Sequence, residues 1–200
     1  MSATRAAALL PAIFLASCGV NAVPTAEEAA KKEWADVQAA FQSRANLIPN
    51  LVATVQGAAG SEERILTQVT EARSRATSIN ITTDDLSNPA ELARFQAAQN
   101  QLTQALGSLR TIVEAYPQLQ SQQGFRDLSV ALEGAENRVR IEVGQYNEAV
   151  QRYNTTIRTF PNAVGAKVFY GAEPMTPYQA TLPGAENAPR VNFDAPAPKS

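Results

Sequence analysis

A nearly continuous stripe of apolar residues between positions 125 and 160 most constrains what this chain can fold into. Its members recur at spacings of three and four residues: Phe125, Leu128, Leu132, Ala135, Val139, Val143, Tyr146, Val150, Tyr153, Ile157 and Phe160. This spacing brings the side chains to one face of an α-helix. We therefore expect a helix about 50 Å long, ended by Pro161, whose apolar face is buried against other helices.

Three earlier segments carry matching apolar faces. Helices are expected over residues 26–59 with a kink at Pro49, over 61–79, and over 89–116. Asn88 is expected to cap the third of these, because Pro89 and Glu91 follow it, and the polar stretch 80–87 is expected to be a loop. The fold class predicted is all-α, an elongated antiparallel four-helix-bundle-like domain.

The composition changes after residue 171. Six prolines punctuate a segment rich in Ala, Gly and Asn: Pro174, Pro177, Pro183, Pro189, Pro196 and Pro198. Such a segment buries too little apolar surface to fold alone, so a disordered Pro-rich C-terminal tail is expected over 172–200. For its one apolar element, Val191-Asn192-Phe193, two interpretations stay open: docking on the bundle or on a partner, and an ordinary mobile end.

The N-terminus carries a short apolar run that ends at the only cysteine. One basic residue, Arg5, precedes the run, and Leu15-Ala16-Ser17-Cys18 closes it. This arrangement resembles a bacterial lipoprotein signal, which implies cleavage before Cys18 and acylation of that cysteine. A signal peptide needs about 7–15 apolar residues and a spanning helix about 20, so the length favours a signal. A secretory signal cut elsewhere and an uncleaved membrane helix stay open as alternatives.

These boundaries predict a signal peptide over 1–17, a tether over 18–25, a helical bundle over 26–171 and a tail over 172–200. The expected location is the cell membrane or the outer membrane, with the lipid-anchored chain facing the periplasm or extracytoplasmic space. No basic cluster is present and the formal net charge is −2, so no nucleic-acid partner is expected. The sequence contains no histidine, which excludes His-based catalysis and His metal ligands.

Several short motifs occur in an order that identifies a family. They are Arg44–Val52, Val69–Arg73, Ala105–Leu109, Glu114–Pro117, Glu133–Arg138, the pairs Tyr146-Asn147 and Tyr153-Asn154, Phe160-Pro161 and Asn187–Phe193. Over almost all of its expected mature length the chain resembles the LemA family of bacterial envelope proteins. The resemblance implies an extracytoplasmic helical bundle tethered at its N-terminus.

Two features depart from the family pattern. Family members usually begin with a transmembrane helix and a Tyr-Asn-containing stretch, whereas this chain has the lipoprotein-type signal followed by Ala26–Lys32. Val143 stands where the family commonly has arginine, so no role of that arginine transfers to this chain.

Polar residues on the apolar faces are candidates for a groove or for setting helix register. Tyr146 and Tyr153 fall in the stripe, and Asn147 and Asn154 at its edge. Hydrogen bonds between helices are favoured over ligand binding for these pairs. Further candidates are Arg44, Asn50 and Glu136; Asn50 directly follows Pro49, and its amide is placed to satisfy carbonyls freed by the proline.

Carboxylates on two of the expected helices are candidate metal ligands. Glu114, Glu133 and Glu136 are reminiscent of di-iron bundles, but those sites need Glu-x-x-His pairs, so no metal and no cofactor are expected. Glu136 and Arg138 are expected to form interhelical ion pairs or to lie in solvent.

The leading functional hypothesis is a scaffold or adaptor without catalysis, tethered through the lipid on Cys18 and directed at envelope proteins or peptides. The alternative is a carrier of a small molecule, lipid or peptide with a pocket near Pro49. A hydrolase is the third possibility, and the sequence shows no nucleophile elbow that would support it.

Overall fold

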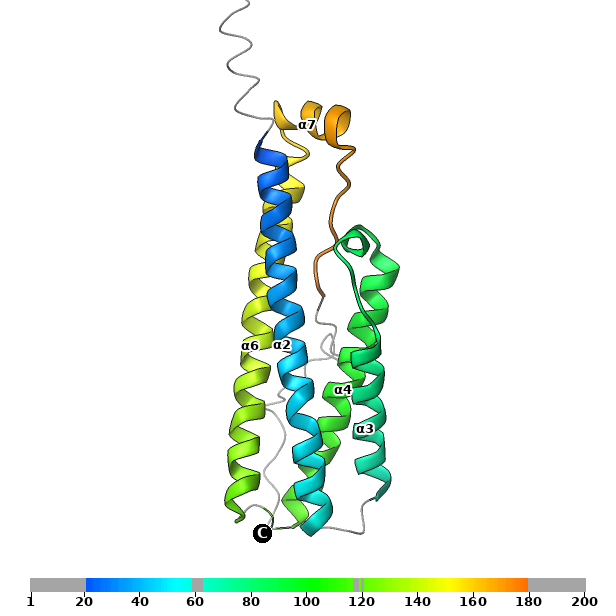
Figure 1. The fold of residues 1–200 in the computed structure, drawn as a ribbon, viewed down its shortest axis with the longest axis vertical. Helices are drawn as coiled ribbons and strands as arrows, with labels where there is room; N and C mark the ends of the chain where they lie inside the picture. The colour runs from blue at the N-terminus through cyan, green and yellow to red at the C-terminus, as the bar shows by residue number, and fades with distance from the viewer. Residues whose placement is uncertain (1–20, 59–62, 117–118, 120, 180–200) are drawn as a thin grey trace, which may run out of the picture.

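The computed structural model describes residues 21–58, 63–116, 119 and 121–179. Four long helices make up most of this part: α2 (Ala22–Ala58), α3 (Glu63–Ser78), α4 (Pro89–Ala115) and α6 (Gln123–Thr156). They run up and down the molecule, with α2 against α6 and α3 against both α4 and α2 (Figure 1). The prediction of an elongated, antiparallel all-α bundle is confirmed, and no strand occurs among the described residues.

The start of α4 follows the expected chemistry. The side chain of Asn88 accepts a hydrogen bond from the amide of Ala90 at 3.1 Å, and Pro89 is the first helical residue. The preceding stretch, expected to be a loop, contains the short 3₁₀ helix η1 (Asp84–Ser87). It is anchored by Ile81 and Leu86, both buried, so it forms part of the core.

Two helix ends differ from expectation. α2 begins at Ala22, within the expected tether, and Val23 is fully buried, which pulls the first turn into the bundle. α6 ends at Thr156 rather than Phe160. Inclusion of Phe160 in the buried stripe is wrong, because its side chain is 85% exposed. The residue before Pro161 is disfavoured in helical geometry, and the chain turns away before reaching it.

Two clusters of buried apolar residues fill the bundle. The upper core, at the end where α2 begins, includes Val23, Trp34, Val37, Phe41, Ile81, Leu86, Phe95, Tyr146 and Tyr153. The lower core includes Ile48, Leu51, Val55, Leu66, Val69, Leu102, Leu109 and Leu119. In the upper core Trp34 packs against Phe95 and Tyr146, with ring centroids 5.6 and 5.1 Å apart. The rod is therefore stabilised by two apolar clusters rather than one.

A cap closes the upper end of the bundle. It consists of α7 (Asn162–Gly165) and the π-helical turn η2 (Ala166–Tyr170), next to the start of α2. Gly171 follows with φ of +56°, a left-handed conformation that suits glycine, and the amide of Ala172 bonds to the carbonyl of Ala166 at 3.0 Å. The chain thereby reverses and runs back down the bundle.

Residues 172–178, which we call the strap, run down the bundle in an extended conformation (Figure 1). Met175 and Tyr178 of the strap are buried in the upper core. The packed domain thus continues past the expected boundary at residue 171 to the strap. The expected disorder of residues 180–200, and the docking of Val191-Asn192-Phe193, concern residues outside the described part of the chain.

The expected lipid attachment at Cys18 and the signal peptide over 1–17 also lie outside the described residues. Within the described part, the helices lack the combination of length and apolarity that crossing a bilayer requires.

Candidate functional site

The two Tyr-Asn pairs of α6 bind the main chain of the strap. Asn154 donates to the carbonyl of Met175 at 2.8 Å and accepts from the Met175 amide at 2.9 Å. Asn147 makes the same two bonds to Tyr178, at 2.9 and 2.8 Å. The sequence predicted that these asparagines set the register between helices. In the structure they instead hold an extended segment of the chain. We call Asn147, Asn154 and Tyr146 the ladder.

The spacing of the ladder matches an extended peptide. Seven residues separate Asn147 from Asn154, which on an α-helix is a rise of about 10 Å. Met175 and Tyr178 are three residues apart, and an extended chain covers about 10 Å over that distance. Because the later asparagine binds the earlier strap residue, the strap runs antiparallel to α6. The Tyr146 hydroxyl donates a further hydrogen bond, at 2.9 Å, to the carbonyl of Thr176, a strap residue that lies between Met175 and Tyr178.

The prolines of the strap fit this mode of binding. The amides of Met175 and Tyr178 bond to the ladder, and the amide of Thr176 bonds to the carbonyl of Leu86 in η1 at 2.8 Å. Pro174 and Pro177 have no amide hydrogen, so neither leaves a donor unpaired. Proline also favours extended geometry in the residue before it. All the amides between residues 174 and 178 are therefore either bonded or absent.

One side chain of the strap fills an aromatic pocket between α2 and α4. The ring of Tyr178 lies 5.8 Å from that of Phe41 on α2 and 6.5 Å from that of Phe95 on α4. Burial raises the pKa of Tyr178 to about 12; Arg44 opposes this shift and Glu136 adds to it. The pocket therefore favours a neutral aromatic side chain at this position.

Arg44 is the centre of a polar layer that lies between the two cores. Its Nη1 donates to both carboxylate oxygens of Glu136, at 2.9 and 3.1 Å, and to the Thr103 hydroxyl at 3.2 Å. Its Nη2 donates to Gln99 at 2.6 Å, and Gln99 donates to the carbonyl of Ala76 at 3.2 Å. Glu136 thus forms an interhelical ion pair, which is one of its two expected surroundings, and its partner is Arg44.

The polar layer occupies the same level on three helices. On each helix the polar residue lies in the sequence between a residue of the upper core and a residue packed in the lower core. On α2 and α4 the upper-core residue comes first, and on α6, which runs the opposite way to α2, the lower-core residue comes first. The three sets are Phe41, Arg44 and Ile48; Phe95, Gln99 and Leu102; and Leu132, Glu136 and Val139. A buried polar layer of this kind fixes the register of a bundle. The sequence predicted that the Tyr-Asn pairs fix the register of the helices. In the structure, the polar layer around Arg44 has this role.

The remaining polar candidates have other surroundings. Tyr153 is buried in the upper core, and burial is the largest cause of its raised pKa. Arg138 pairs with Glu142 on its own helix. Asn50 is exposed, and within the described residues its amide satisfies no carbonyl freed by Pro49. Pro49 is also exposed, and it is not among the residues that line three clefts of the described part.

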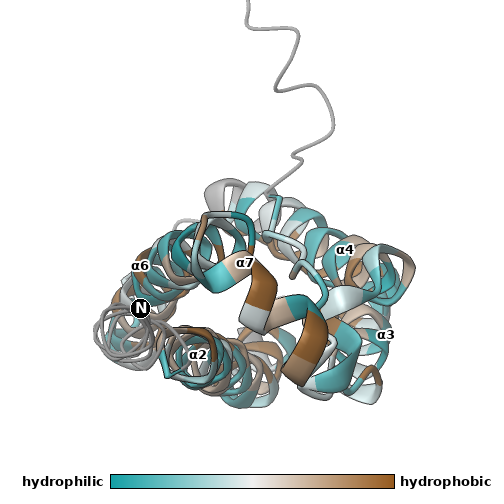
Figure 2. Ribbon diagram, turned by 90° about the horizontal axis from the view of Figure 1, so that it is seen from above, coloured by the Kyte–Doolittle hydropathy of each residue, from teal (hydrophilic) through white to brown (hydrophobic). Residues whose placement is uncertain are grey.

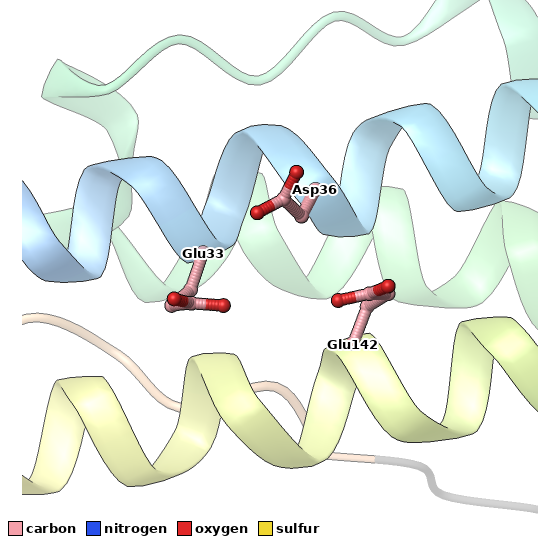
Figure 3. A group of neighbouring side chains, drawn as sticks. All are labelled: Glu33, Asp36 and Glu142. Atoms are coloured by element: carbon pink, nitrogen blue, oxygen red, sulfur yellow. The ribbon is translucent and has the colours of Figure 1, made fainter.

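Three carboxylates that the sequence did not single out meet across the seam between α2 and α6. They are Glu33, Asp36 and Glu142, whose oxygens lie within 4.8 Å of one another (Figure 3). Lys32 donates to Glu33 at 3.1 Å and to Asp36 at 2.8 Å, and Arg138 lies 3.5 Å from Glu142. The cluster is therefore an ion-paired part of this helix interface.

Among the described residues, Glu133 and Glu136, two of the carboxylates predicted as possible metal ligands, belong to no such group. Glu136 is engaged by Arg44, Glu133 is exposed on α6, and the side chain of Glu114 is outside the described part.

Sequence reasoning missed the strap as part of the site. Its prolines indicated a tail that does not fold alone, and that prediction did not consider that the tail could pack on the helical bundle of the same chain. One signal was present: the two asparagines are spaced by two helical turns on the edge of a buried stripe, and an amide there pairs with both the amide and the carbonyl of one extended residue. Met175 and Tyr178, large apolar residues beside prolines, were the matching signal in the strap.

A comparison with protein families identifies a match over most of the chain. The model of the LemA family matches residues 33–193, which is most of the chain and includes the ladder, the polar layer and the strap. No curated protein matches this chain.

Proposed function

The chain belongs to the LemA family, and from this premise we propose that it is a membrane-tethered, extracytoplasmic scaffold or adaptor of the bacterial cell envelope. In this proposal it binds extended segments of other envelope proteins and catalyses no reaction. It is held through lipid on Cys18 at the cell membrane or the outer membrane, facing the periplasm or extracytoplasmic space. The tether is supported by the lipoprotein-type sequence that ends at Cys18.

One observation carries the adaptor role: the ladder holds an extended, proline-containing segment by its main chain. Four of the hydrogen bonds come from two asparagines and involve no side chain of the strap. Recognition through the main chain accepts many sequences, and a pocket for one side chain supplies selectivity. The pocket of Phe41 and Phe95 supplies that element here, and it selects for an aromatic side chain. In this proposal the strap is the occupant supplied by the chain itself.

The carrier alternative receives no comparable support. It places a pocket near Pro49, and that residue is exposed and is not among those that line three clefts of the described part. The absence of catalysis is supported by a sequence without histidine whose only cysteine is assigned to the lipid.

Metabolic labelling tests the tether. Cells expressing the full chain are given labelled palmitate, with Cys18→Ser as the matched control. We expect label on the wild-type chain and none on the variant. An unlabelled wild-type chain that still begins at Met1 would overturn the tether and leave the adaptor role to be judged separately.

A peptide-binding experiment tests the adaptor role. Met175→Ser and Tyr178→Ser together remove the apolar anchors of the strap from the full chain while leaving the ladder intact. A fluorescent peptide with the sequence of residues 172–179 is then added, and its binding is measured by anisotropy. We expect saturable binding that weakens about tenfold when Asn147→Ala is added, because the lost hydrogen bonds contribute about 1–2 kcal/mol.

The matched control is Asn137→Ala, which changes an exposed asparagine of the same helix. Equal affinity with and without Asn147 would contradict main-chain recognition by the ladder. In cells, a photo-crosslinking residue at Gln151, which lines a cleft with Asn147, Asn154 and Pro177, is expected to capture defined protein segments. The same probe at Asn137 is expected not to capture them.

A further inference from the structure

The cap, together with Phe160 just before it, exposes large apolar side chains. Five large apolar residues between positions 160 and 170 are exposed: Phe160, Val164, Val168, Phe169 and Tyr170. Phe160 and Phe169 are 85% and 71% exposed. Figure 2 views this end from above and shows hydrophobic residues in the α7–η2 segment that crosses it. Apolar side chains gathered in one exposed segment mark a docking surface.

The position of the cap limits what covers it. α2 begins at Ala22 beside α7, so the N-terminal residues join the bundle at this end. Only three residues separate Ala22 from Cys18, and such a stretch spans about 14 Å even when fully extended. A membrane anchor at Cys18 would therefore hold the cap within a short distance of the bilayer.

The charge around the cap suits an anionic surface. Arg152, Arg158 and Lys167 are exposed, and the sequence from 152 to 172 contains no Asp or Glu; Glu173, at the start of the strap, is the next acidic residue and is also exposed. Basic residues close to a membrane are attracted to anionic headgroups. Of the nearest acidic residues on α2, Glu27 and Glu28 lie 2.7 and 3.3 Å from Lys31, which compensates part of their charge.

The types of side chain fit the bilayer interface as well. Phe and Tyr beside Lys and Arg are typical of segments that lie at the headgroup level, with apolar parts inserted and charges outside. Met175 and Tyr178 of the strap are buried in the upper core, so the strap leads away from the cap. The strap therefore does not cover the exposed apolar side chains of the cap.

We propose that the cap is a membrane-docking surface: Phe160, Val164, Val168, Phe169 and Tyr170 insert into the interface of an anionic phospholipid bilayer while Arg158 and Lys167 contact its headgroups. Docking holds the rod upright, with the lower end of the bundle away from the membrane. This inference rests on the proposed membrane tether.

Tryptophan fluorescence of the full chain tests docking. Trp34 is the only native tryptophan and is buried, so a tryptophan added at the cap reports separately. Phe169→Trp is compared with Val130→Trp, which changes an exposed valine near the other end of α6. Each variant is mixed with vesicles of phosphatidylethanolamine and phosphatidylglycerol, with or without bromine on the acyl chains. Flotation of the vesicles reports the tether, and quenching by bromine reports the cap.

We expect both variants to float with the vesicles. Bromine is expected to quench the emission of the added tryptophan in Phe169→Trp at least about twofold and to leave the emission of the added tryptophan in Val130→Trp unchanged. Flotation with no quenching of Phe169→Trp would overturn docking and leave the tether in place. Failure to float would overturn the tether together with the docking inferred from it. A concentration-dependent dimer without lipid, dissolved by Phe169→Glu but not by Val130→Glu, would assign the cap to a second copy of the chain and overturn membrane docking.

Discussion

At the scale of single residues, the two members of the Arg44–Glu136 ion pair differ in their exposure to solvent. The side chain of Arg44 is 2% exposed and that of Glu136 is 33% exposed. Arg44 also lies 5.1 Å from the ring centroid of Phe41. A buried charge is tolerated only while its partners are in place, whereas a partly exposed charge is hydrated when its partner is lost. The two ends of this ion pair therefore contribute differently to stability.

Removing the carboxylate is expected to cost more than removing the cation. Glu136→Leu leaves a buried guanidinium without its counter-charge, for an expected loss of about 2–5 kcal/mol in the free energy of unfolding. Arg44→Met keeps a long apolar side chain and leaves a carboxylate that reaches water, so its loss is expected to be smaller. Urea unfolding measures both, with Glu133→Leu, at an exposed position of α6, as the control. A larger loss for Arg44→Met would contradict this account.

The buried phenol of the strap makes stability depend on pH at the alkaline end. Burial raises the pKa of Tyr178 from 10.0 to about 12, so the unfolded chain ionises first as pH rises. The contribution of the neutral phenol is complete below pH 10 and is lost as pH rises toward 12. Tyr178→Phe is expected to move the midpoint of alkaline unfolding upward, measured by circular dichroism. Tyr170→Phe, on the exposed cap, is expected to leave the midpoint in place.

At the scale of elements, the helices and the strap are specified in different ways. α4 begins where its own sequence predicts, because the cap at Asn88 and the proline at its first position are local. The strap has no internal hydrogen bonds that define it, and its conformation depends on Asn147, Asn154 and η1. An element of the first kind is visible in a short window of sequence, and one of the second kind is not.

The local specification of α4 is testable at its cap. Asn88→Ala removes the acceptor for the amide of Ala90, and we expect a loss of about 1 kcal/mol in the free energy of unfolding. Thermal or urea unfolding measures the change. Asn80→Ala changes an exposed asparagine in the preceding loop and is expected to have little effect. Equal losses in the two variants would indicate that Asn88 does not act as a cap.

At the scale of the whole molecule, the bundle consists of two apolar cores joined through one polar layer. Arg44, Gln99 and Glu136 lie at the same level on α2, α4 and α6. Sliding one helix along another would separate these groups and leave Arg44 buried without partners. The layer therefore penalises every alternative register, and the apolar residues above and below it do not.

Replacing the whole layer with apolar residues is expected to separate stability from uniqueness. Arg44→Met, Gln99→Leu and Glu136→Leu together remove the charges and their partners, so the free energy of unfolding is expected to stay the same or to rise, unlike that of Glu136→Leu alone. We also expect more amide resonances in NMR spectra than one packing allows. A loss of stability as large as that of Glu136→Leu would contradict the expected stability of the triple variant. A single sharp set of resonances would contradict the expected loss of a unique packing.

The sequence predicted the helices well and the site only in part. Periodicity located the apolar faces of α2, α3, α4 and α6, because a helix face is set by residues three and four apart. It included Phe160 wrongly, since periodicity continues past the residue at which the helix ends. Arg44, Asn147 and Glu136 were recognised as notable, but their partners come from distant parts of the chain, over which no local pattern extends.

The sequence by itself determined that this chain forms long amphipathic helices, which pack as an antiparallel bundle, because every signal involved acts within a few residues. The tertiary structure alone decided that the Pro-rich segment after Gly171 packs as a strap, that the Tyr-Asn pairs bind it, and that Arg44 carries the register. Those outcomes depend on which groups meet in three dimensions, where an unpaired amide or a buried charge must find a partner.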